Sequence, residues 1–597
     1  MLAGWLIASA SVAWGHKPTA SGVQSRYNST CPSASPWHWE PANRTIPIYL
    51  HTGLTVLKRP DGTNWTLAQI AVQLEQALAT TNDLLGLSVR FYYAGTTSQL
   101  TLDQAIVVSA NLSPSTVAYS ATHVDDCASG HITRGHVELY AYLSINGANG
   151  GPRTFKPFDP AQATPGADIH VAFTHELGHT LALNHTFTDS YGGTPLALLE
   201  HSQGGTYVTT APVMANTPPD HHRHWTSYER ETLFAIPTIP YAVYSVYGIR
   251  TGAYKSWLSG SSGGYGSTWS VGDNDVPSGS AIAFRPGSLS KGAPDLIVPW
   301  IGVDNWRLML KGMRKEFTGT ETAFVVPPTD AYAPPAVAYD SVNQQFAIFY
   351  LEKDPPKVEA NPPYTIFPYG MGSHGPTSPA DYREKRLCWM TSPSGANWTS
   401  QGCLTNPNSG AAIRNRGDQV AASFDPYRKV FVVALVNGSY YINLLTIPVA
   451  GSAQPGNAFT AFGHLSWSPP TVACTGQSNG CLMVFRTYSE ASNLMTLRGE
   501  INTSGGWTQT AQWTNGGDLA QVASPQISYQ SANARFVLAY LKPGSKVIRS
   551  YSRALTDTAW SGANTVHTSP TTISPPVLGN DNGYSQRVII VAVEYAQ

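Results

Sequence analysis

Charged residues are scarce in this sequence. Asp, Glu, Lys and Arg make up 12% of the 597 residues, about half of the ~25% that is usual for a globular protein. The 36 basic and 37 acidic residues nearly cancel, so no strong field of one sign would attract nucleic acid or an acidic membrane surface. Nucleic acid is therefore excluded as an expected partner.

Long hydrophobic runs are missing as well. No stretch approaches the ~18 uninterrupted apolar residues of a membrane-spanning helix, so no membrane span is expected. The apolar start, MLAGWLIASASVAWG, is too short to cross a bilayer and is typical of the hydrophobic region of a secretory signal. These features predict a signal-peptide-like segment at 1–15, a lead segment at 16–40 and a secreted, extracellular protein.

Cysteine is also rare. An even set of cysteines is typical of disulfides in an exported protein, although six residues allow many connectivities. The spacing within the second half indicates structural cysteines that flank turns, rather than catalytic or zinc-binding ones. The disulfide candidates are Cys31, Cys127, Cys388, Cys403, Cys474 and Cys481.

Gly, Pro, Tyr and Trp are abundant, which is the composition of turn-rich β structure. A single hydrophobic core serves no more than ~250–300 residues, so this chain is expected to hold at least two domains. The sequence patterns change near residue 238. We therefore expect one domain at 41–238 and a second at 239–597.

Strand and helix patterns alternate in the first of these domains. IPIYLHTGL (46–54) and SVRFYYAG (88–95) predict strands, and apolar residues at helical spacing predict a helix over 67–86 between them. A second helix is expected from Asp168, a good N-cap, and a third from Thr226, which begins a capping box. The domain is expected to be α+β.

The second domain contains a repeat. In four segments an alternating strand ends, a polar turn follows, and a second strand opens seven residues later. Repeats of roughly fifty residues, each a set of antiparallel strands, indicate the blades of a β-propeller. A looser copy lies at 280–300 and a truncated one at 574–595. The positions that end and open the paired strands are Tyr339 and Phe346, Phe424 and Phe431, Cys474 and Cys481, and Tyr529 and Phe536.

The two ends of this domain each hold half of a repeat. The segment 241–275 lacks a first half, and the copy that ends at 597 lacks a second half. Together they would complete one blade and close the ring, which removes its free edges. We expect six blades. An array of two-sheet β-sandwiches is the alternative for this region.

One short motif carries chemistry, HELGHTLALNH at 175–185. His175 and His179 are four residues apart, so on a helix they project from one face and can bind one ion. Zinc prefers such nitrogen ligands in tetrahedral geometry. Glu176 can take the proton of a zinc-bound water as that water attacks a carbonyl. His185 would need a sharp turn of the chain to join them.

This motif resembles the HExxHxxGxxH motif of the metzincins, and among them the matrixin-like secreted proteases. The resemblance covers about residues 40–238 and implies a twisted sheet over two long helices. It implies that His175, His179 and His185 hold a catalytic zinc ion and that Glu176 is the general base. Met214 would form the methionine turn beneath the metal.

The sequence departs from the family's pattern at two places. Ala182 replaces the glycine of the motif, so we expect a left-handed or bulged turn between Ala182 and Asn184. The cysteine that keeps matrixins latent is absent from its usual motif. A disulfide between Cys31 and Cys127 is expected in place of a zinc-blocking thiol.

Other histidines are weaker metal candidates. Matrixins hold a structural zinc with a His-x-Asp group and nearby histidines. A similar group occurs here at shorter spacing, with ordinary surface histidines as the alternative. The expected cofactor is catalytic Zn²⁺, with a structural Ca²⁺ or a second Zn²⁺ as an additional candidate. The residues of this group are His123, Asp125, His131 and His136.

Two functional hypotheses follow from these patterns. The first is a secreted zinc metalloendopeptidase with an α+β metzincin-like catalytic domain and an all-β propeller. This hydrolase would cleave a protein or peptide substrate, and its propeller would bind the substrate or a surface. The alternative is a propeller-based adhesin or glycan-binding protein whose zinc domain is inactive or serves only maturation. The propeller's ligand would then be a glycan or a protein.

Overall fold

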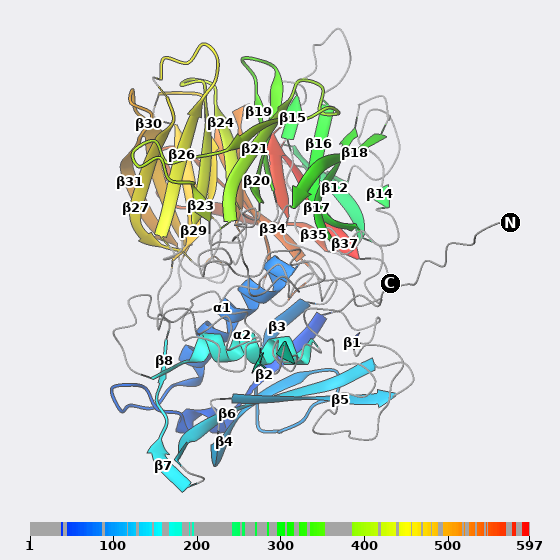
Figure 1. The fold of residues 1–597 in the computed structure, drawn as a ribbon, viewed down its shortest axis with the longest axis vertical. Coiled ribbons are helices and arrows are strands. Elements are labelled where there is room, and N and C mark those ends of the chain that lie inside the picture. The colour runs from blue at the N-terminus through cyan, green and yellow to red at the C-terminus, as the bar shows by residue number, and fades with distance from the viewer. Residues whose placement is uncertain are drawn as a thin grey trace, which may run out of the picture.

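The computed structural model of the chain has a first part built on one mixed sheet and a second part built on a ring of sheets (Figure 1). In the first part it describes residues 38–39, 45–85, 90–115, 118–126, 131–145, 148–157, 166–181, 190–191 and 194–195. In the second part it describes residues 242–250, 253–256, 269–270, 283–285, 295–304, 307–315, 321–330, 335–352, 385–415, 420–436, 441–454, 456–466, 470–478, 480–487, 494–515, 519, 525–531, 534–542, 545, 547–568, 576–580 and 588–595.

The first part is a seven-stranded sheet in which five strands run parallel. Their order is β1 (His38–Trp39), β6 (His131–Ile145), β4 (Ile106–Ser115), β2 (Thr45–His51) and β3 (Arg90–Thr97). Two strands pair with β6 in the antiparallel sense, β5 (Ala118–Asp126) and β7 (Ala148–Pro152). The smaller elements are the 3₁₀ helix η1 (Thr52–Val56) and the paired strands β8 (Phe155–Lys156) with β9 (Ala167–Asp168) and β10 (Ser190–Tyr191) with β11 (Thr194–Pro195).

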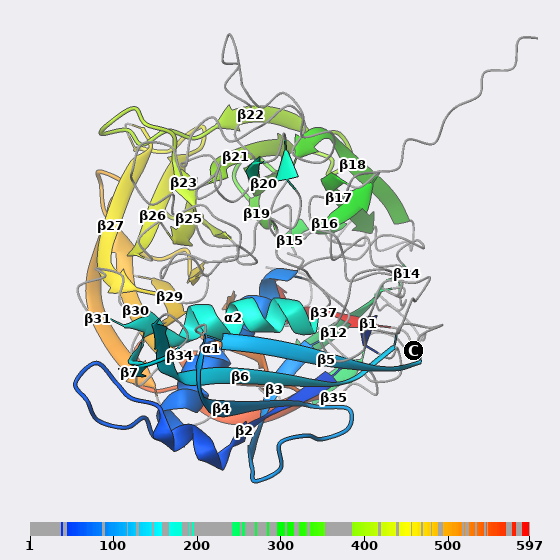
Figure 2. The ribbon, with the colours of Figure 1, turned by 60° about the horizontal axis from the view of Figure 1, so that its bottom comes forward.

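Two α-helices lie between this sheet and the ring (Figures 1 and 2). Helix α1 (Leu67–Leu85) begins with a capping box, because Thr66 and Gln69 each accept a hydrogen bond from the other's backbone N–H, at 3.2 and 3.0 Å. Helix α2 (Ile169–Thr180) is capped by Asp168, whose carboxylate accepts from two backbone N–H groups, at 2.9 and 3.2 Å. The expected start of this helix is confirmed.

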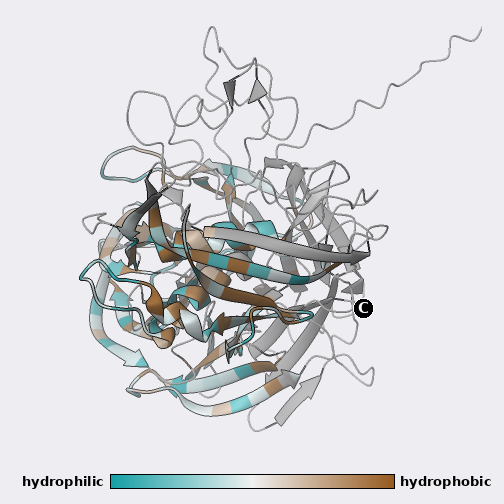
Figure 3. Ribbon diagram, turned by 90° about the horizontal axis from the view of Figure 1, so that it is seen from below, coloured by the Kyte–Doolittle hydropathy of each residue, from teal (hydrophilic) through white to brown (hydrophobic). Residues whose placement is uncertain are grey.

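The core of the first part lies where these helices meet the sheet. Hydrophobic residues are concentrated in the helices and central strands of this part (Figure 3). Their burial supplies the main force that holds the layers together. The fully buried members include Ile46, Leu50, Ile106, Leu139, Leu74 and Ile169.

The second part consists of six separate antiparallel sheets with four principal strands each. Five are meanders of consecutive strands. The first two are β15 (Ala283–Arg285), β16 (Asp295–Asp304), β17 (Arg307–Lys315) and β18 (Glu321–Asp330), and then β19 (Ala336–Asp340), β20 (Gln345–Glu352), β21 (Lys385–Ser392) and β22 (Thr399–Cys403), with β23 (Arg414–Asn415) added to β21. The third and fourth are β24 (Ala421–Asp425), β25 (Val430–Val436), β26 (Tyr441–Pro448) and β27 (Ala458–Leu465), and then β28 (Thr471–Cys474), β29 (Cys481–Arg486), β30 (Leu494–Ile501) and β31 (Trp507–Asn515). The fifth is β32 (Gln526–Gln530), β33 (Arg535–Leu541), β34 (Val547–Ala554) and β35 (Ser561–Thr568).

The sixth sheet is assembled from both ends of this part. Its inner strands are β36 (Val577–Asn580) and β37 (Val588–Tyr595), and its outer strands are β12 (Ala242–Arg250) and β13 (Ala253–Ser256), with β14 (Trp269–Ser270) added to β12. Strand β12 pairs antiparallel with β37 along eight residues. The chain therefore joins its own late and early segments in one sheet.

The first strands of the six sheets form a closed ring. Each contacts the first strand of the next sheet, in the cycle β15, β19, β24, β28, β32, β36 and back to β15. A row of β-sandwiches would not return to its starting strand. The second part is a closed six-bladed β-propeller, in which no sheet presents a free inner edge.

The hairpin between the first and second strand is built alike in several blades. Gln344, Lys429 and Ala534 occupy the same place, directly before the second strand, and have φ of 55°, 56° and 51°. At the other end of two of these turns Asp340 and Asp425 accept hydrogen bonds from backbone N–H groups two residues on. In these three repeats the seven-residue spacing of the sequence therefore reflects one turn geometry.

The predicted fold class is wrong. The described residues are almost entirely β and contain only two α-helices, of 19 and 12 residues, rather than a metzincin-like α+β catalytic domain with long helices. Outside these two helices the described residues are rich in strands and turns. The helix expected from Thr226 lies outside the described residues.

Candidate functional site

The histidine motif lies on α2, as its spacing predicts. The rings of His175 and His179 are 4.9 Å apart between centroids and nearly perpendicular. His175 and Glu176 are 6% and 4% exposed, so the face that carries them is turned into the protein. Two imidazoles on one helix face can approach one ion from two directions.

Helix α2 ends before the third histidine. Its last residue is Thr180, whose hydroxyl donates to the carbonyl of Leu177 at 2.7 Å, and the N–H of Leu181 bonds back into the last turn. Within the described residues His175 and His179 belong to no group of three close metal-ligating side chains. Four residues of the predicted site lie outside the described residues: Ala182, Asn184, His185 and Met214.

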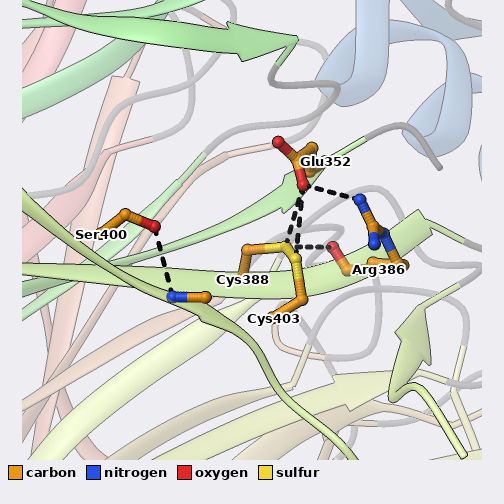
Figure 4. Close-up of a disulfide and its surroundings, with 6 residues drawn as sticks. Glu352, Arg386, Cys388, Ser400 and Cys403 are labelled. Carbon is orange, nitrogen blue, oxygen red and sulfur yellow. Dashed lines mark hydrogen bonds and ion pairs between the residues drawn. A yellow bond between two sulfur atoms is a disulfide. The ribbon is translucent and has the colours of Figure 1, made fainter. Parts of the chain in front are cut away.

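Two groups of cysteine and carboxylate have the composition of a metal site but are disulfides. Cys388 is bonded to Cys403, and Glu352 Oε2 lies 3.3 Å from both sulfur atoms and 3.0 Å from Arg386 Nη2 (Figure 4). Cys474 is bonded to Cys481 beside Asp425. A cystine sulfur is not the thiolate that binds metals. The expected disulfides of the second half are present, while Cys31 and Cys127 lie outside the described residues.

The second histidine group is bound into the first sheet. His136 on β6 lies with Nε2 2.8 Å from Ser109 Oγ and Nδ1 3.8 Å from the carboxylate of Glu138. Burial lowers the pKa of this histidine, and Glu138 opposes that shift. Both ring nitrogens thus face protein groups. The side chains of His123, Asp125 and His131 lie outside the described residues, so the second-zinc prediction stays a prediction.

A further cluster, which the sequence patterns did not predict, lies between two blades of the propeller. Trp513 on β31 has two guanidinium groups near its ring. The Cζ of Arg553 is 4.2 Å and that of Arg498 5.8 Å from the ring centroid. Arg553 also lies 5.6 Å from the ring of Trp560, which donates to Thr496 Oγ1 at 3.0 Å. We call Arg498, Trp513, Arg553 and Trp560 the inter-blade site.

One side of the inter-blade site reaches solvent. Trp513 and Arg498 are half-buried and Thr510 is exposed, whereas Arg553 is completely buried. Arg498 donates to Thr510 Oγ1 at 3.1 Å and to the carbonyl of Leu555 in the next blade at 3.4 Å. The site therefore combines an accessible indole ring with fixed hydrogen-bond donors.

Arg553 keeps its positive charge at neutral pH although it is buried. Burial lowers the pKa of Arg553 to about 10, with Asp557 raising and Arg498 lowering it. A blade-by-blade comparison of the repeats places Arg498 and Arg553 on the third strands of adjacent blades. This register is the signal through which the site could have been found from the sequence.

Comparison with known proteins gives only distant likenesses. No family model matches the chain, and no curated protein matches it. Among solved structures, it resembles AofleA from Arthrobotrys oligospora, with 12% identity and a TM-score of 0.34 over 52% of this chain and 78% of that one. It also resembles the fucose-specific lectin from Aleuria aurantia, with 10% identity and a TM-score of 0.32 over 53% and 87%. A third is the polysaccharide lyase Uly1, with 9% identity and a TM-score of 0.29 over 53% and 90%.

The classification as a matrixin-like metzincin is wrong, and with it the prediction of a zinc metalloendopeptidase. No family model and no curated protein supplies a metzincin relative. The nearly all-β chain with two described α-helices also departs from the fold that the resemblance implied. The motif puts two histidines and a glutamate on helix α2. A sequence match of this length does not determine a family or an activity.

Membrane-spanning helices are absent from the described residues, since neither helix there is both long and apolar enough to cross a bilayer.

Proposed function

We propose that this chain is a secreted carbohydrate-binding protein whose propeller holds the sugar. The two disulfides of the propeller support export, because cystines persist in oxidising compartments. The observation that carries the proposal is the inter-blade site, where an accessible tryptophan ring lies beside charged hydrogen-bond donors.

The chemistry of a sugar fits such a site. A pyranose ring has an apolar face of C–H groups and a rim of hydroxyl groups. An indole ring can pack against the apolar face, and guanidinium N–H groups donate to hydroxyl oxygens. Arg498 is held by Thr510 and by the next blade, so its donors are fixed before a ligand binds. Donors that are already ordered lower the entropic cost of binding.

Other aromatic residues of the blades serve packing instead. A Cβ added at Gly499 would lie 2.3 Å from the ring of Trp507, so this tryptophan covers the backbone of the third strand. Trp507 and Trp560 are each 7% exposed. Trp513 is half-buried, so part of its ring surface reaches solvent and is left for a ligand.

A glycan array with the full chain tests this proposal. We expect binding to a restricted set of glycans, and we expect Trp513→Ala to lower it at least tenfold. Tyr427→Ala is the matched control, because it removes a 49% exposed aromatic ring from another blade. Equal binding by the unmodified protein and both variants would show that the sugar binds outside the inter-blade site. Absence of any glycan binding would overturn the function and favour a protein ligand.

We also propose that the histidines of α2 hold a divalent metal ion, with zinc as the candidate ion and His185 as the third ligand. The 4.9 Å between the rings of His175 and His179 supports this assignment. A bound ion would tie α2 to the segment that follows it. No cleavage of peptides is proposed for this site.

Metal analysis by mass spectrometry tests the second proposal. We expect about one zinc per purified chain, and we expect His175→Ala with His179→Ala to remove it. His464→Ala in the propeller is the control. Retention of zinc by the double variant would contradict the assignment.

A further inference from the structure

We propose that the inter-blade site takes an acidic sugar, one that carries a carboxylate or sulfate group; this inference rests on the proposed carbohydrate-binding function. Its basis is an excess of positive charge between the two blades. Arg498 and Arg553 both lie within 6 Å of the ring of Trp513. Two like charges held this close to one ring favour a ligand of opposite charge.

The protein supplies little negative charge of its own to this place. Among the described residues neither Arg498 nor Arg553 forms an ion pair with a carboxylate. Asp557 is the carboxylate whose charge acts on Arg553 and raises its pKa. It already pairs with Arg535 at 3.5 Å and accepts a hydrogen bond from the N–H of Ala554 at 2.7 Å. Arg535 and Arg553 therefore both draw on the charge of one carboxylate, Asp557.

Arg553 also retains an unused donor. Its side chain is 0% exposed, and its Nη1 has no hydrogen-bond partner in the part of the chain that the structure describes. Its Nη2 donates to the carbonyl of Asp557. A buried guanidinium with an unsatisfied N–H costs free energy. An anion bound near the ring of Trp513 would offset this cost through its charge.

Arg498 is the group that a ligand can reach directly. It is half-buried, and its hydrogen bonds to Thr510 and Leu555 use Nε and Nη1, which leaves the N–H groups of Nη2 for an anion. Hydrogen bonds between guanidinium and carboxylate or sulfate oxygens are about twice as strong as those between neutral groups. The ring of Trp513 would hold the sugar, and the arginine would select its acidic substituent.

The test compares sugars that differ in charge alone. A galacturonic acid oligomer and its fully methyl-esterified form have the same chain, and a sulfated neutral oligomer supplies the second kind of anion. We expect the full-length protein to bind at least one acidic oligomer tenfold or more tightly than its neutral counterpart, by isothermal titration calorimetry. A comparison of the affinities for the galacturonic acid oligomer and the sulfated oligomer shows whether carboxylate or sulfate is preferred.

Substitution identifies the residue responsible. Arg498→Gln should reduce the preference for the acidic oligomer at least fivefold while affinity for the neutral one changes less. Arg428→Gln is the matched control, because Arg428 also stacks on an aromatic ring and donates across blades, to Ile501, but lies outside the site. Equal binding of acidic and neutral oligomers would overturn the acidic preference and leave the carbohydrate-binding function standing. Failure to bind any glycan would overturn both.

Discussion

Single residues set the geometry of the propeller turns. Gln344, Lys429 and Ala534 adopt the left-handed conformation although none is glycine. For a residue with a Cβ this conformation costs roughly 1–2 kcal/mol. This cost is offset because the turn holds the first and second strands of the blade, which flank it, in register. These positions are therefore sites where stability can be gained.

Ala534→Gly should raise the free energy of unfolding of the propeller by about 0.5–1 kcal/mol, because glycine adopts φ near 51° without steric cost. Urea denaturation followed by tryptophan fluorescence measures the change. The control is Ala554→Gly, in strand β34, where the left-handed conformation is not needed and stability should fall. A lower stability for Ala534→Gly would show that the turn is not strained.

Gly499→Ala should have the opposite effect. The added methyl would lie 2.3 Å from Trp507, so the indole ring or the strand must move. Overpacking of this kind costs about 1–3 kcal/mol. Gly463→Ala is the control, because a Cβ there meets nothing within 4 Å. The same denaturation experiment compares them, and equal stability of the two variants would contradict this packing.

At the scale of elements, the sequence predicted what local signals determine. Helix α1 was predicted from apolar spacing, and α2 was predicted from its N-cap Asp168, which was placed correctly. The strand pairs of the blades were predicted from their constant seven-residue spacing. Both signals lie within a few residues of the structure that they specify, so no tertiary information was needed.

Contacts between distant segments escaped this reasoning. Arg498 and Arg553 are far apart in sequence, and only the packing of adjacent blades brings both to Trp513. The protease prediction failed for the opposite reason. It extended a short helical motif to a whole domain, whereas spacing on a helix determines only the relative positions of His175 and His179.

The N-cap of α2 gives a prediction at this scale. Asp168→Ala should lower the stability of the first part by about 1 kcal/mol, because the N–H groups of His170 and Val171 lose their acceptor. Asp168→Asn retains a capping oxygen and should lose much less. Thermal unfolding monitored by circular dichroism measures both variants. Equal losses would mean that the charge of Asp168, rather than its cap, is what matters.

For the whole molecule, the docking of helix α1 on the propeller is the main feature. Glu75 on α1 is half-buried and lies within the electrostatic reach of Arg486, at the end of β29. Burial raises the pKa of Glu75, and Arg486 opposes the shift without cancelling it. Helix α1 lies beside the propeller (Figure 1), and its Glu75 is a carboxylate that is partly deprived of water.

This contact predicts a pH dependence. A carboxyl whose pKa is raised on folding costs stability when it is ionised, above the ordinary pKa of glutamate, and costs nothing at acid pH where folded and unfolded states are both protonated. Glu75→Gln should therefore raise the melting temperature at neutral pH, and the gain should vanish near pH ~4. Asp103→Asn, at an 85% exposed side chain, is the control for the change in net charge. A gain that persists at acid pH would contradict the sign of the shift.

The sheet that joins β12 to β37 has a consequence for biosynthesis. Strand β12 leaves the ribosome roughly 340 residues before its partner. At translation rates of about 5–20 residues per second, it waits roughly 20–70 seconds with its pairing edge uncovered. The ring cannot close until β37 has been made. During that interval the uncovered edge could pair with another chain, so chaperones would have to shield it.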